Sequence, residues 1–242
     1  MTRRAELVLP RDILARGNDW IAIDKPARLP SRPSPGHDSS VLAELERWLA
    51  EHEPSTPRPG VVHRLDRDTS GVLIFSLGTR RHRALVDAFR ARRIRKEYWA
   101  LVIGWPSPRR GTIALALSRN ASGRTIVDSR GMTASTEYET VQRLAQHSIL
   151  RVRPRTGRTH QIRVHLTARG TPVLGDRRYR LPAIASLRAH SATPGIQRAS
   201  RLCLHAAHLI LPPEVAGTEL AINAPLPRDL ARIASRVRSA QR

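Results

Sequence analysis

A dense run of polar side chains occupies residues 61 to 71 of the chain. It reads Val-Val-His-Arg-Leu-Asp-Arg-Asp-Thr-Ser-Gly and follows the turn-forming segment Arg58-Pro59-Gly60. A carboxylate in a loop beside a strand is well placed to act on a ligand. Asp66 stands between Arg64 and Arg67, and an ionised carboxylate can serve as a nucleophile or as a base. The residues alone leave a second interpretation, a surface turn held by a salt bridge.

A second cluster covers residues 155 to 166, where a glycine turn is followed by a helical pattern. On a helix, His160, Arg163 and Val164 share one side because they are three and four residues apart. The turn carries Arg158, and its backbone amides and arginines are suited to hold a phosphate. The alternative is a basic helix N-terminus that only faces solvent.

A third cluster is Lys96-Glu97-Tyr98-Trp99-Ala100-Leu101-Val102. Side chains alternate along a strand, so Tyr98 and Ala100 face one way and Trp99 and Leu101 the other. Tyr98 could stack on a nucleic-acid base. A tyrosine buried in the core is the alternative.

Histidine spacing raises the question of a metal. His205 and His208 form an H-x-x-H pair, and His160 and His165 are close in sequence. The sequence has no H-E-x-x-H motif, no supporting cysteine pair and no acidic cluster beside these histidines. We therefore expect no metal site; the alternative, a metal-dependent RNA hydrolase, would lose activity on chelation.

Composition favours a polyanionic partner. The 242 residues include 42 Lys plus Arg against 20 Asp plus Glu, a formal net charge of +22, and the only lysines are Lys25 and Lys96. Such a field attracts RNA or DNA, and an acidic membrane surface would use the same charge. Cys203 is the single cysteine, which excludes a disulfide framework within the chain.

Hydrophobic patterning predicts the elements that must position these clusters. Ser39-Ser40 can cap a helix over 41–51, where leucines recur at helical spacing. Proline-rich residues 29–38 and 54–60 predict loops, as does the weak periodicity of 181–200. Further helices are expected at 79–92, 161–169 and from about 227 to 242, and strands at 20–24, 71–75, 96–103, within 133–144 and at 148–152.

Strands and helices interleave without a regular βαβ order. We therefore expect an α+β (mixed α/β) fold with a central, largely antiparallel sheet flanked by helices and loops. No composition break marks a second domain, so 1–242 is interpreted as one domain. Neither a secretory signal nor a membrane-length apolar run is evident, and we expect a cytoplasmic protein.

Taken together, the three clusters resemble the RluA-type family of RNA pseudouridine synthases. The resemblance spans about residues 18–211. It rests on the ordered set of motifs Ile23-Asp24-Lys25-Pro26, Arg58-Pro59-Gly60, His63-Arg64-Leu65-Asp66, Asp68-Thr69-Ser70-Gly71, Lys96 to Val102, Thr156 to His165, Leu174-Gly175-Asp176 and Leu204-His205-Ala206.

Three positions depart from the family pattern. Arg28 stands where glycine is usual, Thr171 where histidine is frequent, and Leu211-Pro212-Pro213 replaces an aromatic and His-Pro ending. The resemblance also implies a compact form without the small N-terminal RNA-binding domain of many relatives. The basic surface would then supply the docking to RNA.

The resemblance implies isomerisation of uridine to pseudouridine within an RNA chain, with no cofactor. Asp66 matches the catalytic aspartate, which either attacks the anomeric carbon of the ribose or removes a ribose proton. Tyr98 matches the tyrosine that stacks on the base and takes the proton from carbon 5. Arg163 matches the basic partner of the aspartate, and Arg64 the residue that fills the gap left by the flipped uridine.

Further RNA contacts are expected from Arg67, Lys96, Arg158 and His160. Because a stacked base must be extruded before it can react, the target uridine should lie in a loop or bulge of structured RNA. Ribosomal RNA and transfer RNA both fit, and the default assembly is a monomer. A non-catalytic RNA-binding protein and a DNA-binding or membrane-surface protein are the competing functions.

Overall fold

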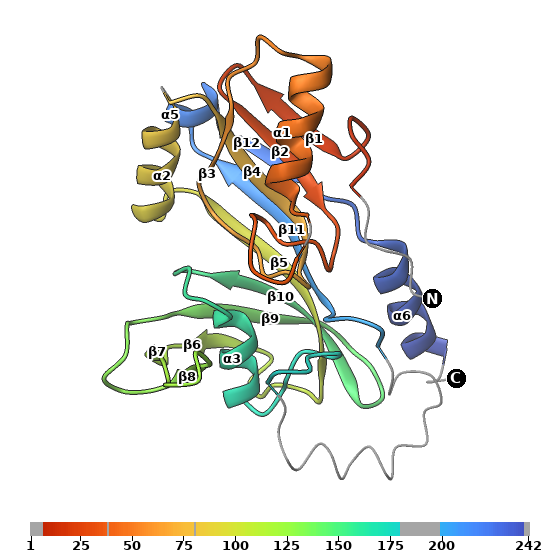
Figure 1. The fold of residues 1–242 in the computed structure, drawn as a ribbon. Coiled ribbons are helices and arrows are strands. Elements are labelled where there is room, and N and C mark those ends of the chain that lie inside the picture. The colour runs from red at the N-terminus through yellow and green to blue at the C-terminus, as the bar shows by residue number, and fades with distance from the viewer. Residues whose placement is uncertain (1–6, 38, 80, 180–198, 240–242) are drawn as a thin grey trace. The chain divides into compact units, whose positions relative to one another are not determined.

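The computed structural model of the chain describes residues 7–37, 39–79, 81–179 and 199–239 (Figure 1). Two compact units are present, and each is described by itself. Unit 1 comprises Met1–Lys96 and Ala206–Pro225, and unit 2 comprises Glu97–His205 and Leu226–Arg242. The loop expected at 181–200 falls, but for its last two residues, outside the described residues. No helix in the described ranges has the length and apolar character needed to cross a bilayer.

Unit 1 is built on a sheet with the strand order β1–β2–β4–β11. β2 pairs antiparallel with β1 and β4, β3 with β4, and β12 with β11. The strands are β1 (Ile13–Gly17), β2 (Trp20–Lys25), β3 (Pro59–Val61), β4 (Ser70–Leu77), β11 (Leu204–Leu211, from Ala206 onward in this unit) and β12 (Leu220–Asn223).

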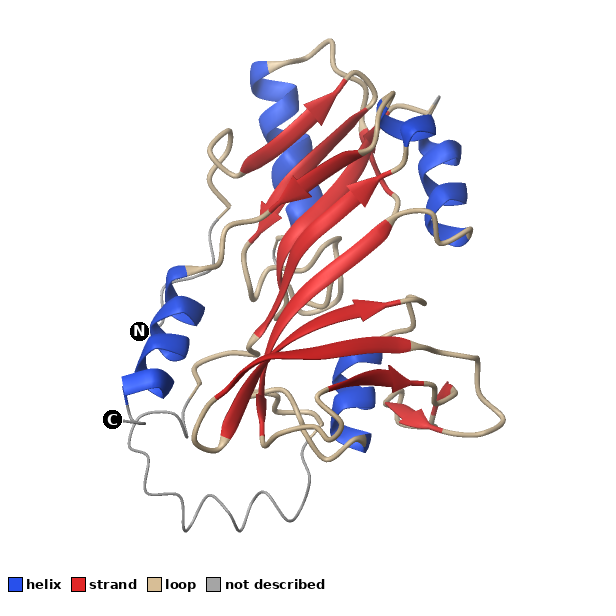
Figure 2. Ribbon diagram, turned by 180° about the vertical axis from the view of Figure 1, so that it is seen from behind, coloured by secondary structure: helices blue, strands red, loops and turns tan. Residues whose placement is uncertain are grey.

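Helices cover both faces of this sheet, which is why β4 is buried along its whole length. α1 (Val41–His52) lies in front of the strands in Figure 1 and behind them in Figure 2. Its N-terminus is capped as expected, because the Ser40 side chain accepts a hydrogen bond from the Ala43 amide at 3.2 Å. α2 (His82–Arg90) and the short α5 (Pro213–Ala216) pack on a core that includes Trp20, Val72, Ile74, Leu209 and Ile222.

Unit 2 contains four neighbouring sheet strands in the order β5–β10–β9–β6, and the pairs within this group are antiparallel. A separate hairpin, β7–β8, lies beside it. The strands are β5 (Arg95–Ile103, from Glu97 onward in this unit), β6 (Arg110–Ile113), β7 (Leu117–Arg119), β8 (Thr125–Val127), β9 (Thr136–Arg143) and β10 (His147–Pro154). The helices are α3 (Gln161–Ala168) and the C-terminal α6 (Arg228–Ser239).

The predicted α+β fold with antiparallel sheet pairing is confirmed, and each predicted strand and helix within the described residues is present. Two details were wrong. The segment 54–60 was predicted to be a loop, but its last two residues belong to β3, and the helix predicted at 79–92 extends only from His82 to Arg90. Strands β1, β6, β7, β8, β11 and β12 were not predicted. All but β11 are three to five residues long, too short for alternation of side chains to stand out in the sequence.

Candidate active site

Asp66 lies in the loop that joins β3 to β4 in unit 1, and a buried lysine holds this loop in place. The Lys25 side chain is fully buried at the end of β2. Its Nζ donates to the carbonyl oxygens of Pro26 (2.8 Å), Leu29 (2.7 Å) and Arg67 (2.9 Å). An ammonium group has three N–H donors, so this one cation ties the 26–29 turn to the residue that follows Asp66.

Two further contacts connect the same segments. The Ser31 hydroxyl donates to the Leu65 carbonyl (2.9 Å) and accepts from the Leu65 amide (3.0 Å), directly before Asp66. The Arg28 amide donates to the Arg67 carbonyl at 2.7 Å, and Arg28 has φ of 73°. Glycine takes this left-handed conformation without strain, whereas an arginine adopts it at some cost.

Gly71 is the second residue of β4, next to the Asp66 loop, and no other residue fits there. Its φ is 113°, and a Cβ on it would lie 2.1 Å from the carbonyl oxygen of Ala206. The backbone of β11 therefore approaches the loop closely, and the motif Asp68-Thr69-Ser70-Gly71 marks this contact.

Replacing Lys25 with Met should lower the free energy of unfolding by about 3 kcal/mol or more, because three carbonyl oxygens, one buried and two partly buried, lose their donor. The matched control is Lys96→Met. Among the residues that the structure describes, none forms a hydrogen bond or ion pair with the Lys96 side chain, and burial lowers its pKa. Urea denaturation at pH 7 should show little or no loss for Lys96→Met. Equal losses in both variants would show that the three carbonyl bonds do not hold this loop.

His63 precedes the loop and is a neutral acceptor. Its Nε2 accepts from the Ile74 amide at 3.0 Å, and its ring stacks on Phe89 with centroids 4.5 Å apart. Burial, with the charge of Lys96 adding to it, lowers the pKa of His63 to about 3. The ring therefore buttresses β4 rather than exchanging protons at neutral pH.

Acid should destabilise the wild-type protein more than His63→Gln. Between pH 6.5 and about 3, the unfolded chain binds a proton at His63 that the folded protein does not. Stability from this group is thus present above pH 6.5 and falls by up to about 1.4 kcal/mol per pH unit below it. A glutamine can still accept from the Ile74 amide. Denaturation at pH 7 and pH 5 measures the difference, and equal pH slopes for the two proteins would contradict it.

Tyr98 lies on β5, which belongs to unit 2 from Glu97 onward. Its side chain is 8% exposed, and it pairs with Val152 of β10. Alternation along β5 places Tyr98 and Ala100 on one face, as expected, and both are buried. Tyr98 is thus a buried core residue, which is the alternative that the sequence left open. Its burial also restricts the orientation of the ring.

The turn before α3 is locked by the Gln161 side chain. Gln161 accepts from the Thr156 hydroxyl (2.6 Å) and the Arg158 amide (3.0 Å), and donates to Ser135 and Thr136 (both 2.9 Å). His160 stands at the helix start with φ of 55°. The turn is therefore fixed to the beginning of β9.

Arg163 is buried in α3 and makes a two-point ion pair with Asp176. Its Nε lies 2.7 Å and its Nη2 3.0 Å from the two carboxylate oxygens. No role was predicted for Asp176 from the sequence, although it ends the motif Leu174-Gly175-Asp176. Tyr179, whose hydroxyl lies 2.7 Å from His160 Nδ1, was missed as well, since neither spacing nor composition distinguished it.

The predicted RNA contacts are distributed over both units. In unit 1, Arg64 is exposed, and Arg67 is exposed beside Asp68 with its Nε 3.2 Å from that carboxylate. In unit 2, Arg158 Nε donates to the Thr133 carbonyl at 3.2 Å. The structure thus groups Arg64, Asp66, Arg67 and Lys96 in unit 1, and Tyr98, Arg158, His160 and Arg163 in unit 2.

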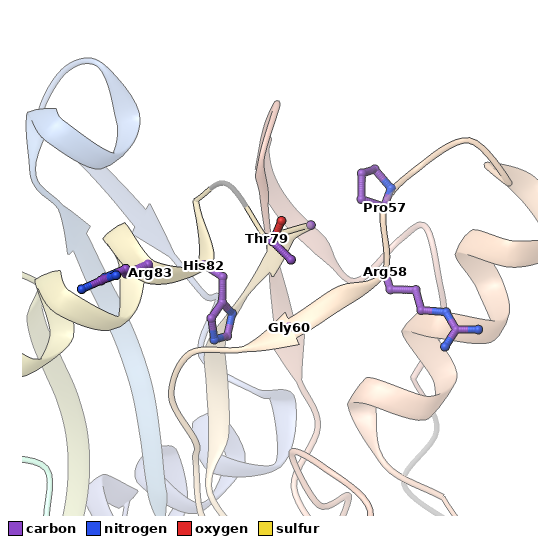
Figure 3. Close-up of a pocket in the computed structure, with 7 residues that line it drawn as sticks. Pro57, Arg58, Gly60, Thr79, His82 and Arg83 are labelled. Carbon is purple, nitrogen blue, oxygen red and sulfur yellow. The ribbon is translucent and has the colours of Figure 1, made fainter.

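A cavity of about 620 Å³ lies at the other end of the β3–β4 pair (Figure 3). Strand β3 enters there and β4 leaves there, whereas the Asp66 loop joins their opposite ends. The His82 ring at this cavity has its Nδ1 2.9 Å from Ser76 Oγ. The cavity is lined by Pro57, Arg58, Gly60, Gly78, Thr79, His82 and Arg83.

The histidines that suggested a metal have other partners. His165 is bonded through its two ring nitrogens to Thr136 Oγ1 and the Leu115 carbonyl, both at 2.9 Å. His205 and His208 are three residues apart on β11 and so point to opposite faces. In the part of the chain that the structure describes, no three His, Cys, Asp or Glu residues are arranged to hold a metal ion.

Comparison with known proteins gives concordant matches. Residues 19–168 match the sequence profile of the RNA pseudouridylate synthase family. An uncharacterized RNA pseudouridine synthase of Chloroflexus aurantiacus is 42% identical over 86% of this chain and 63% of its own length, so the chain spans less than two thirds of that relative. The ribosomal large subunit pseudouridine synthase D of Pseudomonas aeruginosa is 33% identical over 97% and 78%. Among solved structures, human RNA pseudouridylate synthase domain containing 4 superposes with a TM-score of 0.77 at 26% identity, covering 95% of this chain and 94% of that one.

Proposed function

The chain belongs to the RNA pseudouridine synthase family, whose members convert uridine to pseudouridine within RNA, and we propose that Asp66, Tyr98 and Arg163 carry this reaction here. The observation that carries the proposal is the construction of the Asp66 loop. Buried Lys25, Ser31 and Gly71 fix the backbone on both sides of one acidic residue. Such constraint on a loop residue is typical of a functional group that must be held in place.

In the proposed reaction, the bond between uracil and the ribose breaks, the uracil turns, and its carbon 5 joins the ribose. The proton lost from carbon 5 is balanced by one gained at the released nitrogen 1, so no atom is gained or lost overall and the reaction needs no cofactor. Asp66 acts on the ribose, either by attack on the anomeric carbon or by removal of a ribose proton. Tyr98 stacks on the base and takes the proton from carbon 5, and Arg163 supplies the positive charge that accompanies the carboxylate.

The substrate we propose is a uridine in a loop or bulge of structured RNA, with ribosomal RNA as the first candidate. Extruding the base costs a few kcal/mol, and the cost is least where the base is not already paired. Arg64, Arg67, Lys96, Arg158 and His160 are the proposed RNA contacts. Several relatives are named for the ribosomal large subunit, and transfer RNA is the second candidate. We further propose that the protein acts as a monomer in the cytoplasm.

Purified protein incubated with unmodified ribosomal and transfer RNA transcripts tests the proposal. Chemical labelling of pseudouridine, read by sequencing, reports the modified position. We expect wild-type protein to produce pseudouridine at a discrete uridine and Asp66→Asn to produce none. A pseudouridine that disappears from total RNA on gene deletion identifies the natural site. Transcripts that bind but never react would instead indicate a non-catalytic RNA-binding protein.

A further inference from the structure

A short segment of unit 2 after α3 connects the strand of Tyr98 to the side chain of Arg163. Two backbone hydrogen bonds join this segment to β5. The Ile103 amide donates to the Pro172 carbonyl (3.0 Å), and the Leu174 amide donates to the Leu101 carbonyl (2.8 Å). At Gly175, with φ of 78°, a Cβ would lie 1.9 Å from the carbonyl oxygen of Arg201. A side chain at position 175 would therefore collide with this carbonyl, and the close approach of the two backbone segments requires glycine.

Asp176 follows immediately and binds Arg163 through both carboxylate oxygens. The two side chains are 1% and 9% exposed. Oδ1 of Asp176 also accepts the backbone amides of Arg178 (2.9 Å) and Tyr179 (3.0 Å). A two-point bond between a guanidinium and a carboxylate fixes the plane of the guanidinium as well as its position.

Tyr179 contacts the same guanidinium with its ring. The Arg163 guanidinium carbon lies 5.0 Å from the ring centroid, and that of Arg124, from the β7–β8 turn, also lies 5.0 Å from it. The ring is 3% exposed. A cation over an aromatic face is attracted more strongly when water is excluded, so Tyr179 restrains Arg163 in the direction that Asp176 does not.

We propose that Asp176 and Tyr179 are positioning residues for Arg163, the carboxylate fixing the plane of its guanidinium and the ring fixing its face. This inference rests on the proposed catalytic role of Arg163. The orientation of the charge is then set before RNA binds. A group that is already oriented toward developing charge needs no reorganisation during the reaction, and a displacement of about 1 Å can cost about 10²-fold in rate.

Asp176→Asn is the first test, measured as kcat and KM on an RNA transcript that the wild-type protein modifies. Asparagine Oδ1 still accepts the two backbone amides, whereas its NH2 group opposes the Arg163 Nε donor. We expect kcat to fall on the order of 10²-fold, with KM changed less than about threefold because the phosphate contacts remain. The matched control is Asp229→Asn, which removes the two-point pair with Arg201 (2.5 and 2.9 Å) in the same unit. It should leave kcat unchanged.

A double-mutant cycle separates positioning from a general structural effect. If Asp176 acts through Arg163, then Asp176→Asn should lower kcat in the wild-type background and have no further effect in Arg163→Met. Additive losses, or wild-type kcat in Asp176→Asn, would overturn the inference while leaving the role of Arg163 intact. Wild-type kcat in Arg163→Met would refute the proposed function of Arg163 itself.

Tyr179 provides a test that does not depend on the folding of Asp176→Asn. Tyr179→Phe keeps the ring face and loses only the bond to His160, so its kcat should remain within about threefold of wild type. Tyr179→Leu removes the face, and its kcat, measured well below the melting temperature of either variant, should fall about tenfold relative to Tyr179→Phe. Equal kcat in the two variants would contradict the proposed contact.

Discussion

Asp66→Asn should reduce turnover on a reactive transcript by at least about 10³-fold, because the side chain loses the charge that either attack on the ribose or removal of its proton requires. The substitution preserves size, and the bonds of Lys25 to the Arg67 carbonyl and of Ser31 to the Leu65 carbonyl hold the neighbouring backbone. The fold should therefore persist. Single-turnover assays with excess enzyme report the chemical step without interference from product release.

RNA binding by Asp66→Asn should stay near that of the wild type. Affinity for a polyanion depends on the number of phosphates neutralised, and this number sets the slope of log K against log salt. Removal of one negative charge from a protein with a net charge of +22 should change that slope little. Filter binding at several salt concentrations measures it.

Asp68→Asn is the matched control for the loss of a carboxylate in this loop. Asp68 is two residues away, partly exposed and paired with Arg67, and an exposed pair contributes about 1 kcal/mol or less. Its variant should retain turnover within a few-fold. If Asp66→Asn retained as much turnover as Asp68→Asn, the proposed catalytic role of Asp66 would be refuted.

The sequence was sufficient to locate Asp66 and the elements around it. A polar cluster between a Pro-Gly turn and an apolar run predicts a loop before a strand, and the structure places Asp66 between β3 and β4. Ser40 and the spaced leucines predicted α1 correctly. These features are local, since caps, turns and periodicity are properties of neighbouring residues.

The contacts that hold the site were beyond a reading of the sequence because they join distant segments. Lys25 bonds to the carbonyl of Arg67, 42 residues later, and a carbonyl acceptor leaves no mark on residue type. Arg163 meets Asp176 only because the segment after α3 returns along β5. With forty arginines in the chain, composition could not indicate which of them is buried and paired.

The charged side chains divide into an exposed group and a buried group with different roles. Most ion pairs among the described residues are at least partly exposed, as Arg83 with Asp87 and Arg95 with Glu219 are, and contribute little to stability. A net charge of +22 mainly attracts a polyanion. The buried cations act differently: Lys25 and Arg163 are each matched to specific oxygen acceptors. Mutations of exposed arginines should thus change affinity and salt dependence, whereas mutations of these two should change stability or rate.

Tyr98→Phe is expected to lower kcat by about 10²- to 10³-fold with little change in KM. The phenyl ring still stacks on the base, and only the hydroxyl that takes the proton from carbon 5 is lost, a contribution typical of general base catalysis. The ring is buried within β5 at its pairing with Val152, so removal of one oxygen should not move it. Steady-state kinetics on the transcript measures both constants.

Tyr138→Phe is the matched control, since Tyr138 is a 5% exposed tyrosine of the same unit whose hydroxyl donates to the Pro108 carbonyl at 3.1 Å. Loss of that hydrogen bond should cost about 1 kcal/mol of stability and leave kcat unchanged. A wild-type kcat for Tyr98→Phe, together with a reduced one for Tyr98→Leu, would restrict Tyr98 to stacking and assign the proton transfer to another group. A comparable fall for Tyr138→Phe would show that any lost tyrosine hydroxyl disturbs the unit, so only a loss confined to Tyr98 supports a chemical role.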